Sequence, residues 1–195
     1  PGKPDAKMTD LGTFGGRQGT AVAVTSAGQI AGWATLPGSG GWDGAAHSFI
    51  ATIAGDGTVT KTDIMPSIQS FATAINDAGQ VAGNFQNSDG ETRGFLYSGG
   101  QYYDLGKWVY GSSAYGINNA GQVVGSAIAD SVNYNSHAFI ATVDSQGTAT
   151  LTDLGTLGGA SSTAYDINNQ SQAVGTSNPA GDPNLSHAFL AQNGH

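Results

Sequence analysis

One phrase occurs four times in the sequence, as "AVTSAGQIAG" (23–32), "AINDAGQVAG" (74–83), "GINNAGQVVG" (116–125) and "DINNQSQAVG" (166–175). The equivalent positions Gly28, Gly79, Gly121 and Ser171 follow one another at intervals of 51, 42 and 50 residues. A catalytic site is normally built once, from groups that converge on one point. A phrase that recurs at this period instead predicts a repeated supersecondary unit with loops of variable length.

Each repeat predicts four short antiparallel strands. A first strand, such as "TAVAVT" (20–25), is followed by a glycine turn and a second strand, such as "QIAGWAT" (29–35). Both segments are short and rich in β-branched residues, and glycine supplies the positive φ of a tight turn. Third strands are predicted to begin at His47, Arg93, His137 and His187, and fourth strands to end near Asp63, Asp104 and Asp153. Four strands in about 40–50 residues is the period of a β-propeller blade.

We therefore predict an all-β fold, a four-bladed β-propeller of four-stranded antiparallel blades that forms a single domain. The blades would span 13–64, 65–105, 106–154 and 155–195 of the 195 residues. The last repeat stops after its third strand, while "KMTDLGTFGG" (7–16) closely resembles "TLTDLGTLGG" (150–159). A strand within residues 6–12 is thus expected to close the ring, with Lys7–Leu11 pairing with Ala188–Ala191. The alternative is an open arc that exchanges this strand with a neighbouring molecule, giving a strand-swapped dimer or polymer.

The repeat resembles a known family. "DLGTLGG" (153–159), "INNAGQVVG" (117–125) and "HAF" (137–139 and 187–189) are similar to the HAF repeat of bacterial proteins described as probable extracellular. The first two repeats depart from it, with "HSF" (47–49) and "RGF" (93–95). The resemblance implies an extracellular or cell-surface location. It carries no catalytic residues, and no signal peptide is recognisable in this chain.

The repeated histidines are expected to be structural. Because the start of a third strand faces the end of a fourth, hairpin register pairs a cation or imidazole with a carboxylate: His47 with Asp63, Arg93 with Asp104, His137 with Asp153, and His187 with Asp10. A shared zinc or copper site is the weaker interpretation, because imidazoles in different blades lie too far apart for bonds of about 2.1 Å. The repeated phenylalanines Phe49, Phe95, Phe139 and Phe189 are expected to pack between blades.

Composition excludes several classes of partner. The formal net charge is −8, with only six lysine and arginine residues, which argues against nucleic acid and anionic membranes. No apolar run approaches the ~20 residues of a membrane span. The chain has no cysteine, which fits a secreted protein folding without disulfides and a cytosolic one equally well.

If the repeats form the scaffold, function is expected where they differ. In each blade, the connections between second and third strands, and between a fourth strand and the next first strand, emerge on one face and vary in sequence. They carry aromatic rings and carboxylates, which together suit a sugar. We expect the ligand-binding residues to be Trp42, Asp43, Trp108, Tyr110, Tyr134, Asp130 and Asp182. The alternative is that the aromatic residues among them only fill gaps between loops.

The leading hypothesis is a non-catalytic extracellular module that binds a polysaccharide, surface glycan or surface protein. The alternatives are a structural assembly protein and a polysaccharide hydrolase or lyase, whose acids would come from Asp43, Glu91, Asp130 and Asp182. No cofactor is indicated. The segments "NSDGE" (87–91) and "DSVNYN" (130–135) both offer oxygen ligands for calcium, although neither has the spacing of an EF-hand. An ion in the central channel is a further alternative.

Overall fold

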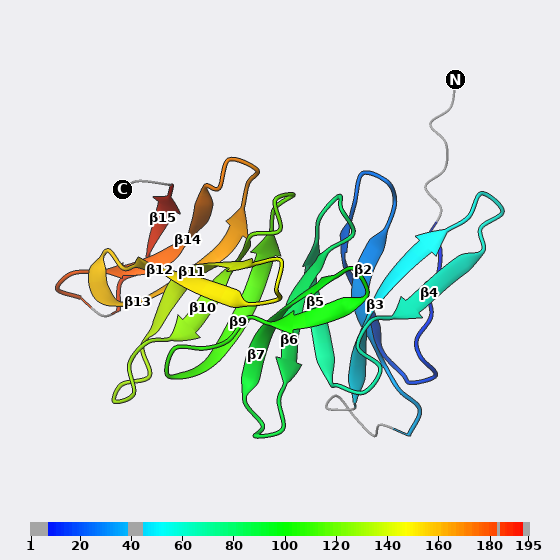
Figure 1. Cartoon of the computed structure of the whole chain (residues 1–195), viewed down its shortest axis with the longest axis horizontal. Helices are drawn as coiled ribbons and strands as arrows, with labels where there is room; N and C mark the ends of the chain where they lie inside the picture. The colour runs from blue at the N-terminus through cyan, green and yellow to red at the C-terminus, as the bar shows by residue number, and fades with distance from the viewer. Residues whose placement is uncertain (1–7, 39–44, 183, 193–195) are drawn as a thin grey trace.

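A computed structural model of the chain describes residues 8–38, 45–182 and 184–192, and all of its regular structure is β (Figure 1). The strands form four antiparallel sheets of four, four, four and three strands, each in chain order. The first two sheets contain β1 (Gly19–Val24), β2 (Ile30–Thr35), β3 (Ala46–Ile53), β4 (Val59–Asp63), β5 (Ser70–Ile75), β6 (Val81–Gln86), β7 (Thr92–Ser98) and β8 (Gln101–Asp104). The last two contain β9 (Tyr110–Ile117), β10 (Val123–Ile128), β11 (Ser136–Val143), β12 (Ala149–Gly155), β13 (Gly158–Ile167), β14 (Ala173–Pro179) and β15 (His187–Ala191). The predicted all-β repeat is confirmed, and no helix among these residues is long and apolar enough to cross a membrane.

The repeated phrase makes the turn between the first and second strands of each sheet. The residue at its glycine position is left-handed in all four repeats, with φ of 80° at Gly28, 74° at Gly79, 76° at Gly121 and 60° at Ser171. In the second repeat, Asn76 Oδ1 accepts the N–H groups of Ala78 (3.1 Å) and Gln80 (3.0 Å), which fixes the turn. The predicted role of the phrase as a turn is confirmed.

A phenylalanine and a glycine oppose each other in every sheet. Phe139 on β11 faces Gly125 on β10, and the same register pairs Phe49 with Gly32 and Phe95 with Gly83. A Cβ on Gly125 would lie 2.8 Å from Phe139 Cζ, so a larger residue there would displace the ring. These three phenylalanines are at most 1% exposed, which places them in the core.

Adjacent sheets are joined by small residues and by serine hydroxyls. Ser70, Ser112 and Ser162, on the first strands of the second to fourth sheets, are buried. Each Oγ accepts a backbone N–H from the third strand of the preceding sheet, from Ser48 (3.0 Å), Gly94 (3.0 Å) and Ala138 (2.8 Å) respectively. Two residues further along, Ala72, Ala114 and Ala164 are at most 2% exposed, so they let the strands approach closely.

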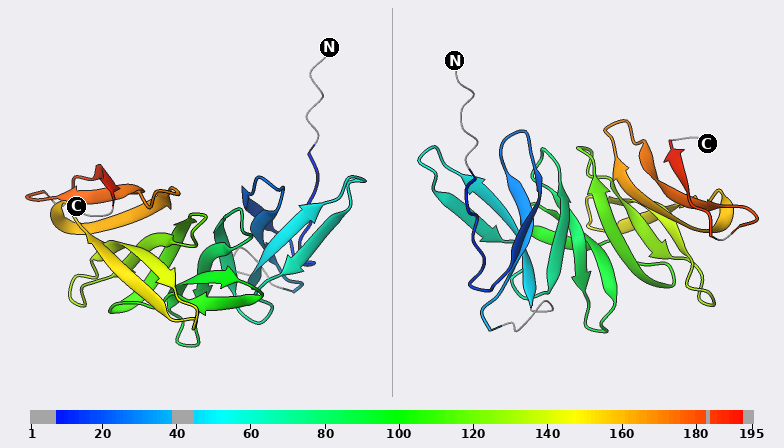
Figure 2. Two further views of the ribbon diagram at one scale, coloured as in Figure 1. Left: turned by 45° about the horizontal axis from the view of Figure 1, so that its top comes forward. Right: turned by 180° about the vertical axis from the view of Figure 1, so that it is seen from behind.

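The predicted ring closure is not formed. Figure 2 shows the four sheets succeeding one another along an open arc, with the first sheet and β15 at opposite ends. Within the described residues β15 pairs only with β14, and Met8–Leu11 is in no strand. Lys61 Nζ on the first sheet donates hydrogen bonds to Leu11 O (3.2 Å) and Thr13 O (2.8 Å), which holds this segment away from β15. Lys7, the first residue of the predicted pairing, lies outside the described residues.

The predicted division of the connections between two edges is visible in Figure 1. The turns β1–β2, β5–β6, β9–β10 and β13–β14 lie along the upper edge in this view, and the connections β6–β7 and β10–β11 lie along the lower edge. The turns carry the repeated phrase and the lower connections vary in sequence. The variable β6–β7 and β10–β11 connections therefore project from the same side of the arc.

Candidate functional site

A groove of about 410 Å³ lies where the third sheet meets the second. Its floor is formed by β9 and β10, and its rim by the β6–β7 and β10–β11 connections. Most of its exposed surface is apolar, and hydroxyl groups predominate among its polar side chains. The lining residues used below are Glu91, Tyr110, Ser113, Ser126, Tyr134 and Ser136.

Two tyrosine rings stand side by side at the rim of this groove. Tyr110 begins β9 and Tyr134 belongs to the β10–β11 connection, and their ring centroids are 5.4 Å apart with an interplanar angle of 31°. Tyr110 is 42% exposed and Tyr134 60% exposed. Sequence analysis named both residues, and the structure brings them together, from the start of β9 and from the β10–β11 connection, into one aromatic platform.

Asp130 holds the loop that carries Tyr134. Its Oδ1 accepts the N–H of Val132 at 2.8 Å, and its Oδ2 accepts the Nδ2–H groups of Asn133 (3.0 Å) and Asn135 (3.2 Å). These bonds, that from the Val132 backbone first, lower the pKa of Asp130 below its ordinary value because they stabilise the carboxylate. The carboxylate oxygens of Asp130 were predicted to contact a ligand. In the structure they accept hydrogen bonds from the loop itself and thereby organise it.

The backbone of Tyr134 is held in the left-handed region, with φ of 56°. A bulky residue rarely adopts this conformation, which favours glycine and asparagine. The hydrogen bond from Ala129 N to Asn135 O (2.9 Å) closes the base of the loop around it. Strained residues of this kind are concentrated at binding sites, where the surrounding structure enforces an otherwise unfavourable orientation.

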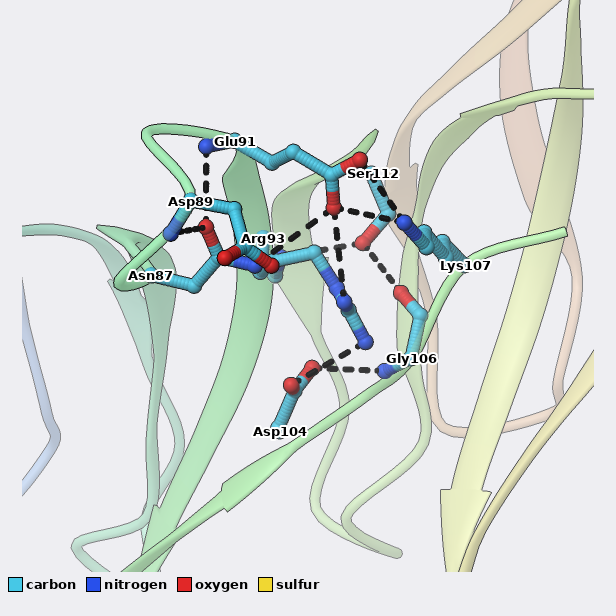
Figure 3. A network of polar contacts seen from close by, with 9 residues as sticks. Asn87, Asp89, Glu91, Arg93, Asp104, Gly106, Lys107 and Ser112 are labelled. Atoms are coloured by element: carbon cyan, nitrogen blue, oxygen red, sulfur yellow. Dashed lines mark hydrogen bonds and ion pairs between the residues drawn. The ribbon is translucent and has the colours of Figure 1, made fainter. Parts of the chain in front are cut away.

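On the other rim of the groove, Glu91 is fixed by charge. Lys107 Nζ lies 2.7 Å from both carboxylate oxygens, and Arg93 Nη1 lies 3.7 Å from Oε2 (Figure 3). The hydrogen bond from Lys107 is the main cause of a lowered Glu91 pKa. Arg93 Nη2 also lies 3.0 Å from Asp104 Oδ2, so the guanidinium links the two carboxylates. Glu91 therefore presents a fixed, ionised acceptor beside the groove.

Three of the four predicted pairs between third and fourth strands are confirmed. His47 Nδ1 lies 2.6 Å from Asp63 Oδ2, His137 Nδ1 lies 2.9 Å from Asp153 Oδ2, and Arg93 pairs with Asp104 as described above. The fourth pair, His187 with Asp10, is not formed because the two residues lie at opposite ends of the arc.

Of the other predicted ligand-binding residues, Trp108 and Asp182 do not line the groove. Trp108 is half-buried, and its ring packs edge-on against Phe139 at a centroid distance of 6.4 Å. Asp182 is exposed in the β14–β15 connection, where Oδ1 accepts the N–H of Asn184 at 2.9 Å. Trp42 and Asp43 lie outside the described residues.

The described part of the chain does not assemble a metal site. It contains no group of three or more His, Cys, Asp and Glu side chains that could hold a metal ion. In the first segment considered for calcium, Asn87 Oδ1 already accepts the N–H groups of Asp89 (3.0 Å) and Glu91 (2.9 Å). Arg93 bridges the carboxylates of Glu91 and Asp104, whereas a glycosidase needs one carboxyl held protonated.

Sequence reasoning missed two parts of the site. Lys107 was seen only as part of a variable connection, and its partner Glu91 belongs to another connection, so no local pattern joins them. The serine hydroxyls of the groove floor, on Ser113 and Ser126, fall inside the repeated strands, which were assigned to the scaffold. Strict alternation would place Ser113 on the opposite face of β9 from Tyr110, and only the register shift between Tyr110 and Ser112 brings them to the same side, so no sequence pattern joins them.

Comparison with known proteins gives a family without an assigned activity. Residues 100–193 match a family described as "Protein of unknown function (DUF3466)", a match that covers just under half of the chain. The matched segment includes the third and fourth sheets, and with them Tyr110 and Tyr134. No curated protein matches the chain.

Proposed function

We propose that this protein is a non-catalytic binding module that recognises carbohydrate through the groove at Tyr110 and Tyr134. The observation that carries the proposal is the exposed tyrosine pair, which borders an open, mostly apolar groove that also contains serine hydroxyls and a fixed carboxylate. Exposed aromatic rings on a soluble protein are unusual enough to indicate an interaction site when they are grouped with convergent polar groups.

The chemistry of the groove suits a sugar ring. The C–H face of a pyranose stacks on an aromatic ring, so Tyr134, the more exposed of the pair, would act as the platform. The sugar hydroxyls donate and accept hydrogen bonds, which the side chains of Ser113, Ser126 and Ser136 can match. Glu91 would accept from a hydroxyl on the opposite rim. An open groove of this kind suits a segment of a polymer.

Binding without turnover is favoured by the ionisation of the carboxylates. A glycosidase needs a general acid whose pKa is raised, whereas the pKa of Glu91 is lowered by Lys107 and that of Asp130 by its loop hydrogen bonds. Both groups would stay deprotonated at neutral pH. They can accept hydrogen bonds from a ligand but cannot protonate a leaving group.

The propeller and the extracellular location belong to the same proposal. The repeat of one joint between successive sheets supports treating each sheet as a propeller blade, although closure of the four into one ring is not formed here. The likeness to the HAF repeat supports placing the protein outside the cell or at its surface. The propeller architecture and the extracellular location are both consistent with a rigid scaffold that displays variable loops on one side.

Calorimetric titration against a panel of soluble bacterial, algal and plant polysaccharides tests the proposal. We expect saturable binding by the intact protein, weakened about tenfold or more by Tyr134→Ala and by Tyr110→Ala, because each removes stacking area. Tyr134→Phe is expected to retain most of the affinity, since it keeps the ring.

The matched control is Tyr165→Ala. Tyr165 is 52% exposed and is also paired with a tyrosine, Tyr115, at 5.9 Å, but neither ring belongs to the groove. Equal losses in Tyr134→Ala and Tyr165→Ala would contradict the assignment of the site. Release of new reducing ends from a bound polysaccharide would contradict the non-catalytic part of the proposal.

A further inference from the structure

The first strand of the first sheet exposes a surface that is buried at every inner joint. Ala72, Ala114 and Ala164 are at most 2% exposed because each packs against the preceding sheet. Ala21 occupies the same position of the repeat on β1 and is exposed. The N-terminal end of the arc therefore presents a joint face with no sheet against it among the described residues.

A groove of about 210 Å³ lies at this face, and an inner joint shows what fits such a groove. The groove is bordered by Leu11 on one side and Ala21 on the other. At the joint of the second and third sheets the equivalent residues are Leu105 and Ala114, and Gly94 of the third strand β7 lies between them. A Cβ on Gly94 would be 3.3 Å from Ala114 Cβ and 3.4 Å from Leu105 Cδ1. The groove is thus shaped for a third strand.

The segment beside this groove already has the conformation of the end of a fourth strand. Asp10 Oδ1 accepts the N–H of Gly12 at 2.8 Å, as Asp153 Oδ1 accepts that of Gly155 at 2.7 Å. The glycines match as well, with φ of 65° at Gly12 and 70° at Gly155. In the inner sheets the other oxygen of this aspartate, Oδ2, binds the histidine or arginine that begins the third strand.

The opposite end of the arc carries a third strand, β15, of the kind that the groove at the N-terminal end lacks. β15 has no partner on its outer side within the described residues, and it begins with His187, which is exposed. Ala188, at the position equivalent to Gly94, is exposed too, whereas its other equivalents, Ser48 and Ala138, are fully buried. The two ends of the arc are therefore complementary.

A directional ladder of hydrogen bonds along the turns supports the same complementarity. The N–H of Ser26 donates to Asp77 Oδ1 (3.0 Å), that of Asp77 to Asn119 Oδ1 (3.0 Å), and that of Asn119 to Asn169 Oδ1 (2.8 Å). The ladder ends at Asn169, whose N–H has no acceptor within the described residues. If the first sheet of a second copy followed the fourth sheet, the Ser26 hydroxyl of that copy would accept the N–H of Asn169. The ladder would then continue by one step.

We propose that the protein associates head to tail with a second copy of itself, β15 of one copy docking between Met8–Leu11 and β1 of the other. Lys61 holds Met8–Leu11 at the far end of the arc from β15 of the same chain. The Met8–Leu11 segment of a second copy can pair with β15 without distorting the sheets. His187 of one copy then pairs with Asp10 of the other. The joint between copies would lack the serine hydrogen bond of the inner joints, because Gly19 occupies the position at which the other first strands have a bridging serine. This contact is heterologous, so it builds a ring or a filament.

Cysteine cross-linking tests the contact directly, because the natural chain has no cysteine. The register Ile50↔Thr62 in the first sheet, repeated as Ile140↔Thr152 in the third, places Leu190 opposite Thr9. Opposed residues on antiparallel strands are close enough for a disulfide. We expect oxidation of a mixture of Thr9→Cys and Leu190→Cys proteins to give a cross-linked dimer of one copy of each.

Val174→Cys is the matched control for Leu190→Cys. Val174 is 45% exposed and pairs with Leu190 on the neighbouring strand β14, so it lies one strand further from the docked segment. It is expected to cross-link to Thr9→Cys far less. Equal yields from both mixtures would indicate random collision and would overturn the proposal.

Sedimentation analysis over a range of concentrations gives a second test without cysteines. His187→Ala is expected to raise the dissociation constant about tenfold or more, because it removes the partner of Asp10. His187→Arg is expected to restore association, since Arg93 fills the same role in the second sheet. A protein that stays monomeric at every concentration overturns the proposal. So does a Thr9→Cys, Leu190→Cys double variant whose disulfide forms within one chain, because that result means closure of a single ring.

Discussion

His47 Nδ1 lies 2.6 Å from Asp63 Oδ2, joining the start of β3 to the end of β4, and the same contact recurs in the third sheet between His137 and Asp153 at 2.9 Å. The two sites differ in burial. The side chain of His47 is 8% exposed, whereas that of His137 is 28% exposed. Water can replace a lost partner more readily at the more exposed site, so the two pairs are expected to differ in their contribution to stability.

The loss in the free energy of unfolding on replacing each histidine should follow the order of their burial. His47→Ala is expected to lower the free energy of unfolding by about 1–3 kcal/mol, because it leaves the Asp63 carboxylate without its partner. His137→Ala should cost less, and His187→Ala should leave the monomer unchanged, because His187 is exposed. Urea unfolding of the three variants measures this, and equal losses for all three would contradict the assigned contacts.

Gly125→Ala should be among the most damaging single substitutions in the chain. A Cβ at this position would overlap Ser113 O and lie 2.8 Å from Phe139 Cζ, so both a strand and a core ring would have to move. We expect a loss of about 3 kcal/mol or more in the free energy of unfolding. Gly55→Ala is the control, because a Cβ there has no atom within 4 Å and the residue is not left-handed.

Stability should fall in acid partly through Asp77. Its pKa is lowered from the ordinary value of 3.8, mainly by the hydrogen bond from the Ser26 backbone and further by those from the Ser26 hydroxyl and Asn119. Because the folded pKa lies below the unfolded one, this stabilisation is present above about pH 4 and is lost as the pH falls through the folded value. Thermal melts between pH 2.5 and 6 should show a smaller acid-induced decrease for Asp77→Asn than for the natural protein.

Asp130→Ala should separate binding from stability. Removing the carboxylate frees the amides of Val132, Asn133 and Asn135 to bond to water, and it releases the left-handed backbone of Tyr134. We expect affinity for the polysaccharide to fall about as much as in Tyr134→Ala, with little change in the melting temperature. Calorimetry and thermal melts on one preparation provide both values. Unchanged affinity would mean that the loop does not position the ring.

Much of the scaffold was predictable because it is repeated and local. The order of the strands, the glycine turns and the pairs His47–Asp63, Arg93–Asp104 and His137–Asp153 all follow from alternation and hairpin register within one repeat, whereas β9 and β13 begin earlier than predicted, at Tyr110 and Gly158. The predicted pairing of Lys7–Leu11 with β15 failed for the opposite reason. Sequence likeness identifies a fourth strand but does not say which sheet receives it, and Lys61 holds Leu11 at the first sheet.

The candidate site was predictable in type but only partly in membership. Tyr110 and Tyr134 were named because they interrupt the repeat, and they meet in the structure. Trp108 interrupts it in the same way, yet its ring packs on Phe139. A sequence cannot distinguish these cases, because the side of the chain to which a loop aromatic turns depends on tertiary packing. The pairing of Lys107 with Glu91 joins two separate connections and has no local signature.

The most direct test of the binding proposal is an NMR titration of the ¹⁵N-labelled protein with the tightest-binding soluble polysaccharide of the panel, fragmented to oligosaccharides. The proposal predicts saturable shifts of the backbone amides around Tyr110, Ser113, Ser126 and Tyr134, with those of Tyr115 and Tyr165 unchanged. Shifts centred on Tyr115 and Tyr165, or no shift with any sugar of the panel, would contradict the assignment of this groove as a carbohydrate site.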